Sequence, residues 1–210
     1  STRPGLRCRC CVAGAALVAA HPHPPQAAMT ENSCSDVAST ALNNPPSGDA
    51  VAGVIATPVV IDGVEGLQHW LARELPPGPW MTLPQSHIDA FAEATGDRQW
   101  IHVDTARAAN SVFGSTIAHG FLTLALIPGM LEQCVDLRRV AMGVNYGVNK
   151  VRFITPVPAG ARVRGCFRLD QLTPIEGGMQ THWTVRIELQ GSERPALVAE
   201  WLTRRYAERA

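Results

Sequence analysis

The sequence lacks an excess of charge of either sign, and it lacks a long apolar run. Its 18 basic residues balance 18 acidic ones, and charged residues are only 17% of the 210. Nucleic-acid binders normally carry a basic excess that meets the phosphates, so no nucleic-acid partner is predicted. No apolar run approaches the roughly 20 residues that span a bilayer, so no membrane partner is predicted either.

Paired cysteine motifs are also missing, although the chain has six cysteines. Cys134 and Cys166 lie within apolar stretches, and we interpret them as buried free thiols in a reducing compartment. The other four precede residue 35, and their spacing is not that of the paired C-x-x-C motifs of zinc sites. The histidines and acids form no metal-ligand set. We therefore expect no metal, no other cofactor and a cytoplasmic location.

The first 57 residues show no sustained hydrophobic period and are rich in Ala, Pro, Ser and Asn. This composition predicts a mostly disordered segment. Its basic residues and the short apolar run Cys11 to Ala20 resemble a signal peptide. The interpretation we favour is an extension outside the natural protein, with Met29 opening the native chain. In both cases 1–57 is set apart, and 58–210 is predicted to be the folded domain.

Helical periodicity dominates the first half of that domain. Apolar spacing predicts a helix over 64–75 and a second helix between Pro84 and Gly96, where glycine suits the left-handed C-cap. The stretch 120–134 is apolar nearly all round, which is typical of a helix buried on most sides. Pro128 is expected to bend this helix or to break one of its hydrogen bonds.

The second half of the domain alternates with a period of two. Apolar side chains occupy every second position from Trp183 to Leu189, and polar ones stand between them. This pattern predicts an antiparallel sheet with one face in water. The fold class is therefore α+β, with a buried helix on one sheet face. The expected strands are 139–148, 150–155, 162–173, 180–190 and 196–206.

An acid and a histidine stand out between these halves. Asp97 and His102 follow a helix-breaking glycine, and bulky Trp100 and Ile101 lie between them. A carboxylate and an imidazole that converge on one water form a general acid–base pair, typically worth about 10²- to 10⁴-fold in rate. On pattern alone, a turn aspartate and a buried structural histidine are the favoured interpretation.

A resemblance to a known family changes that balance. Two blocks carry it: Gly96-Asp97-x-Gln99-x-Ile101-His102-x-Asp104 and Phe113-Gly114-x-Thr116-Ile117-Ala118-His119-Gly120-Phe121-Leu122. They resemble the signature of the MaoC-like dehydratases, which include the R-specific enoyl-CoA hydratases, and the version with Gln99-Trp100-Ile101-His102 is most similar to the nodulation protein N-like branch. The resemblance covers about residues 60 to 206.

This resemblance implies a hot-dog fold, in which a curved antiparallel sheet wraps the helix 120–134. It also implies a homodimer and a CoA or acyl-carrier thioester as substrate. Matched residue by residue, Asp97 and His102 are the catalytic pair, and the Gly120 N–H faces the thioester carbonyl. Substrate contacts are expected from Gln99, Trp100, His119 and Phe121. Of these, His119 is favoured as a structural histidine over a second base.

The function expected is reversible hydration of a trans-2-enoyl thioester to the (R)-3-hydroxyacyl thioester. One alternative is an acyl-CoA thioesterase on the same fold. The other is a non-catalytic partner subunit that binds acyl thioesters. Asp97 and His102 together favour the hydratase. The sequence leaves open the acyl-chain length, the choice between CoA and carrier protein, and which of the pair is the formal base.

Overall fold

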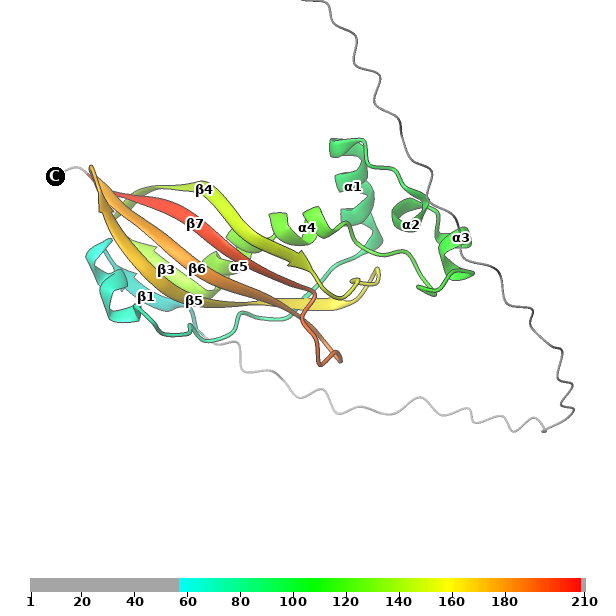
Figure 1. Ribbon diagram of the computed structural model, residues 1–210, viewed down its shortest axis with the longest axis horizontal. Helices are drawn as coiled ribbons and strands as arrows, with labels where there is room; N and C mark the ends of the chain where they lie inside the picture. The colour runs from blue at the N-terminus through cyan, green and yellow to red at the C-terminus, as the bar shows by residue number, and fades with distance from the viewer. Residues whose placement is uncertain (1–56, 209–210) are drawn as a thin grey trace, which may run out of the picture. The chain divides into compact units, whose positions relative to one another are not determined.

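The computed structural model describes residues 57–208 (Figure 1). The predictions for residues 1–56, including the four N-terminal cysteines and the alternative start at Met29, lie outside the described residues. The boundary predicted between residues 57 and 58 stays a prediction.

Five antiparallel strands form the main sheet, in the order β2-β5-β6-β7-β4. Figure 1 shows this sheet curling around the helices α4 and α5, which is the α+β hot-dog fold expected. A separate parallel pair joins β1 to β3. The strands are β1 (Val59–Asp62), β2 (Met81–Thr82), β3 (Val135–Arg138), β4 (Val140–Phe153), β5 (Arg162–Ile175), β6 (Gly178–Leu189) and β7 (Leu197–Ala207).

The helices gather in two groups. The pair α4 and α5 lies against the sheet, whereas α1, α2 and α3 gather at one end of it (Figure 1). A 3-10 helix, η1, follows β1. Their bounds are η1 (Glu65–Trp70), α1 (Gln85–Thr95), α2 (Trp100–Val103), α3 (Thr105–Ala109), α4 (Gly120–Ala125) and α5 (Ile127–Cys134).

Alternating side chains build the core between sheet and helices. Val163, Phe167 and Leu169 of β5 are buried, and so is Trp183 of β6. The Phe167 ring meets the Trp183 ring edge-on, with centroids 6.4 Å apart. Gly165 leaves room for the Phe167 ring, because a Cβ at position 165 would lie 2.6 Å from that ring. Each aromatic side chain of this kind removes about 150–250 Å² from water when it is buried, so the pair contributes strongly to the core.

The helix predicted over 120–134 is interrupted, as its proline indicated. α4 ends at Ala125, α5 begins at Ile127, and Pro128 stands in the first turn of α5. The prediction that this helix is buried on most sides is only partly met, because Ala125 is exposed within this chain. Burial raises the pKa of the Cys134 thiol to about 11, and Cys166 is buried too. Both are free thiols, as predicted.

The helix predicted over 64–75 is wrong beyond its first turns. Only η1 forms, and Ala72 then adopts a positive φ of 59°. The backbone instead pairs with β5: the Ala72 N–H donates to Leu169 O, and the Leu75 N–H donates to Phe167 O. Hydrogen bonding to β5 therefore outweighs the local helical pattern here.

The predicted strands 139–148 and 150–155 are one strand, β4, with a register shift near Lys150 (φ 47°). β4 lies at an edge of the sheet and exposes Met142, Val144, Tyr146 and Val148 by 40–54%.

Within residues 57–208, no helix is long and apolar enough to cross a membrane.

Candidate active site

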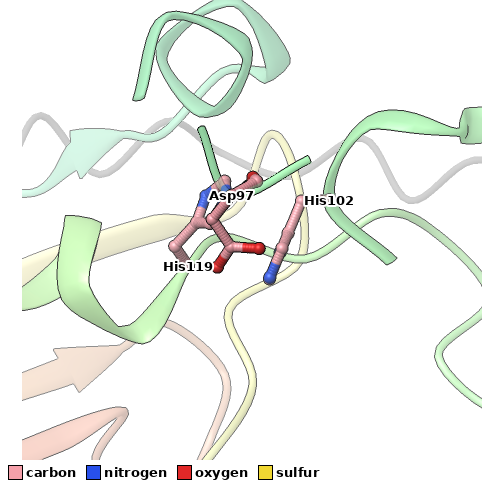
Figure 2. A group of neighbouring side chains, drawn as sticks. All are labelled: Asp97, His102 and His119. Carbon is pink, nitrogen blue, oxygen red and sulfur yellow. The ribbon is translucent and has the colours of Figure 1, made fainter. Parts of the chain in front are cut away.

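Asp97 comes from the turn between α1 and α2, and His102 comes from α2 itself. Gly96 ends α1 in the left-handed conformation with φ 78°, as predicted, and the chain then reverses. Asp97 lies in this turn with its side chain exposed, whereas His102 in α2 is buried. One side-chain N or O atom from each of Asp97, His102 and His119 lies within 4.8 Å of the others (Figure 2).

Backbone contacts fix the His102 ring. Its Nδ1 lies 2.7 Å from the Ile117 carbonyl oxygen, and because a carbonyl only accepts, Nδ1 carries the proton. In the neutral ring the lone pair is then on Nε2. An Nε2 lone pair accepts a proton, so this tautomer is suited to the role of a base toward water.

A glutamine holds the same segment from α1. The Gln85 side-chain amide donates to His102 O at 2.7 Å, and its oxygen accepts from the Thr116 hydroxyl. The Ile117 N–H also donates to Ile101 O. These contacts join α1, α2 and the segment before α4, so the histidine is oriented by three parts of the chain.

His119 contacts both members of the predicted pair. Its ring stacks on His102 with centroids 3.7 Å apart and planes 24° apart. Its Nε2 lies 2.8 Å from the backbone oxygen of Asp97. The side chain is 2% exposed, and its Nδ1 has no hydrogen-bond partner within the described part of the chain.

A cleft of about 370 Å³ opens beside the first residue of α4. His102, Gly120 and Phe121 line it, together with Phe153 from the end of β4. Apart from His102 and two threonines, its lining is apolar, which fits an acyl group better than a charged ligand. A Cβ on Gly120 would lie 2.8 Å from the Phe153 ring, so glycine also serves close packing there.

Within residues 57–208, Asp97, His102 and His119 are close enough together to be considered as a metal site. A zinc ion needs imidazole nitrogens about 2.0–2.1 Å away, with their in-plane lone pairs aimed at it. The stacked rings of His102 and His119 lie in nearly parallel planes. Their lone pairs therefore do not converge on one ion, and this arrangement does not fit a shared metal.

Of the remaining predicted residues, one lines the cleft and the others do not. Phe121 lines the cleft, but Gln99, Trp100 and His119 are absent from its lining within this chain. Instead, the Arg107 guanidinium lies over the Trp100 ring, 4.2 Å from its centroid. For Gln99 and Trp100, substrate contact stays a prediction.

Sequence reasoning missed three residues of the site: Gln85, Thr116 and Phe153. Thr116 lies inside the second sequence block. Gln85 lies outside both blocks, and no spacing in the sequence indicates that it reaches the site. Phe153 ends β4, 33 positions after Gly120, and no local pattern links them.

Comparison with known proteins gives relatives over the same region. Residues 69–188 match the family model described as "MaoC like domain". The 3-hydroxyacyl-thioester dehydratase Z of Mycobacterium tuberculosis is 48% identical over 126 residues, 60% of this chain and 83% of that protein. The nodulation protein N of Rhizobium leguminosarum bv. viciae is 46% identical over 136 residues, 63% and 84% of the two chains.

Solved structures show the same fold. The unliganded R-hydratase PhaJ1 from Pseudomonas aeruginosa aligns with a TM-score of 0.55 at 22% identity, over 66% of this chain and 83% of that one. The fold is that of an R-hydratase, and the relationship to the dehydratase of Mycobacterium tuberculosis makes this chain an enzyme of the hydratase and dehydratase class. The chain belongs to the MaoC-like family, as its two sequence blocks indicated.

Proposed function

We propose that this protein reversibly hydrates a trans-2-enoyl thioester, carried on CoA or an acyl-carrier protein, to the (R)-3-hydroxyacyl thioester. The observation that carries the proposal is the 2.7 Å contact between His102 Nδ1 and Ile117 O, made while the ring lines the cleft. Because a carbonyl only accepts, this contact leaves the lone pair on Nε2. A base with its lone pair free, an exposed carboxylate nearby and an apolar cleft are what water addition to an alkene needs.

In the proposed reaction, one water donates a hydrogen bond to the Asp97 carboxylate and one to His102 Nε2. Its oxygen attacks the β-carbon while the pair takes up the proton. The alkene electrons move toward the thioester, and the Gly120 N–H stabilises the enolate oxygen. The pair then returns a proton to the α-carbon on the same face. Loss of one such oxyanion donor typically costs roughly 3 to 4 kcal/mol.

The relatives favour this substrate class. The Mycobacterium tuberculosis protein is named a 3-hydroxyacyl-thioester dehydratase and is 48% identical to this chain over the aligned region. Asp97 and His102 both stand in the matched region. A cytoplasmic location and a reaction without a cofactor belong to the same proposal.

The test follows the conjugated enoyl absorbance of a short trans-2-enoyl-CoA with the purified protein and its Asp97→Asn variant. We expect signal loss with the thioester intact, and a fall of about 10²- to 10⁴-fold in the variant. Asp136→Asn makes the same chemical change on β3, away from the site, and is expected to behave as the parent. Full activity in Asp97→Asn contradicts the role of that carboxylate.

The same assay separates the two alternatives. A thioesterase releases the CoA thiol, which a thiol reagent detects while the alkene persists. A non-catalytic subunit binds the thioester with neither signal. If CoA substrates fail at every chain length and acyl-carrier substrates fail too, the hydratase proposal is wrong.

We also propose that the protein is a homodimer joined through the exposed face of β4. Contiguous exposed apolar surface of this kind marks an association site, and an unpaired edge strand is a template for pairing. Light scattering is expected to give twice the chain mass for the parent and for Val112→Arg, a change in a loop residue that is 97% exposed. Val144→Arg, on β4, is expected to give monomers. A monomeric parent contradicts the proposal.

A further inference from the structure

His119 is a buried side chain to which the proposed reaction assigns no role. It immediately precedes Gly120 and is 2% exposed. It does not line the cleft, so it is no candidate to touch the substrate within this chain. Its contacts nevertheless reach both Asp97 and His102.

The contact with Asp97 has a defined direction. A carbonyl oxygen only accepts, so the His119 Nε2 carries the hydrogen and donates it to Asp97 O across 2.8 Å. The ring is held on other sides as well. It stacks on His102, and the Phe91 ring lies with its centroid 5.0 Å away. The donor is therefore fixed in place by packing.

The turn that it meets has little other support. Within residues 57–208, the remaining hydrogen bonds recorded for 96–99 stay within α1, α2 and the turn itself. The ion pair between Arg98 and Glu93 is exposed, and pairs of that kind typically contribute about 0 to 1 kcal/mol. The bond from His119 is the one that reaches the turn from the buried start of α4.

We propose that His119 is a positioning residue: its Nε2–H anchors the backbone of Asp97 and so sets the carboxylate against His102. This inference rests on the proposed hydration and assigns His119 a role outside substrate binding. A misplacement of about 1 Å costs on the order of 10²-fold in rate, although the chemical groups themselves are unchanged. The anchor therefore acts on turnover through Asp97.

Three variants separate the hydrogen bond from the stacking. His119→Phe keeps an aromatic ring against His102 but has no donor. His119→Asn also lacks a donor at the Nε2 position, and it is smaller, so it introduces no crowding. His119→Gln reaches with its amide nitrogen to about the Nε2 position and keeps the donor.

We expect kcat to fall about 10- to 100-fold in the Phe and Asn variants and to stay within about fivefold of the parent in the Gln variant. KM is expected to change little in all three, because His119 does not line the cleft. A merely structural histidine would lower melting temperature without this rescue by glutamine. Parental kcat in the Phe and Asn variants, or an equal loss in the Gln variant, overturns the proposal.

Amide hydrogen exchange gives a readout that needs no activity. Residues 97–99 are expected to exchange faster in His119→Phe and His119→Asn than in the parent and His119→Gln. If the parent shows no hydration, the proposed function fails, while the exchange result still tests the anchor. Equal exchange in all four proteins overturns it.

Discussion

The sheet and the active-site end of this domain are held together in different ways. In the sheet, β5, β6 and β7 are chain neighbours, paired along nearly their whole length. At the site, three hydrogen bonds join residues 15, 17 and 22 positions apart: His102 to Ile117, Gln85 to His102, and His119 to Asp97. The sheet is thus stabilised by many similar contacts, and the site by a few individual ones.

This difference has an energetic meaning. When one sheet contact is lost, many neighbouring contacts still hold the same strands together. When one site contact is lost, a polar group is left without another hydrogen-bond partner. A typical intramolecular hydrogen bond contributes only about 0.5–1.5 kcal/mol net, which is small for folding. At a reacting centre the same loss moves a group that must be positioned closely. We therefore expect substitutions in the sheet to lower mainly stability, and substitutions at the site to lower mainly turnover.

The strongest separation is expected for the acid–histidine pair itself. Asp97→Asn and His102→Gln should each lower kcat by about 10²- to 10⁴-fold. The double variant should be about as slow as the slower single one, because groups that act as a unit are not additive. Melting temperature should change little for Asp97→Asn, whose side chain is exposed. Kinetics and thermal unfolding of all four proteins measure this, and additive losses would mean that the two residues act independently.

The reverse separation is expected in the sheet. Phe167→Ala removes a ring that is 1% exposed and packs against Trp183, so unfolding free energy should fall by about 3–5 kcal/mol. At a temperature where this variant is folded, its kcat should be close to the parent's. Arg168→Ala, the exposed neighbour, should stay within about 0.5 kcal/mol. Denaturant unfolding checks both, and a large loss of kcat in folded Phe167→Ala would couple the two regions.

The same contrast explains what the sequence could predict. Strands such as β5 and β6 follow from alternation, because each position's burial is set by the pleat. The turn at Gly96 and the break near Pro128 follow from local backbone chemistry. The helix beyond Trp70 was wrong because its backbone bonds to β5, a partner about 95 positions away that no local pattern shows.

Knowledge of the site was limited for the same physical reason. Asp97 and His102 stand close in the sequence and inside a recognisable motif, so the sequence alone identifies them as candidates. Gln85 and Phe153 reach the site through tertiary packing alone. His119 was in the motif and was expected to contact substrate or to be structural. Its bond to the Asp97 backbone depends on how α4 meets the turn, and no spacing rule contains that geometry.

The smallest effects on stability and turnover are expected at Gln85, which belongs to α1 and whose side chain bonds to His102 O and the Thr116 hydroxyl of the site. Gln85→Leu keeps a similar volume but leaves His102 O and the Thr116 hydroxyl without their partner. Each unmet polar group costs about 1–3 kcal/mol when it is fully buried, and His102 and Thr116 are both buried residues. We expect a loss of about 1–2 kcal/mol in stability, below that of Phe167→Ala, because solvent reaches Gln85 itself.

The same variant should lower kcat by about tenfold, since the His102 backbone loses its tie to α1. Gln68→Leu makes the same substitution at an exposed position of η1 and should change neither quantity. Unfolding curves and kcat of both variants decide the point. A stability loss with unchanged kcat would place Gln85 with the core rather than with the site. The anchoring of His102 would then rest on its bond to Ile117 O, whose acceptor is a backbone carbonyl that no side-chain substitution removes.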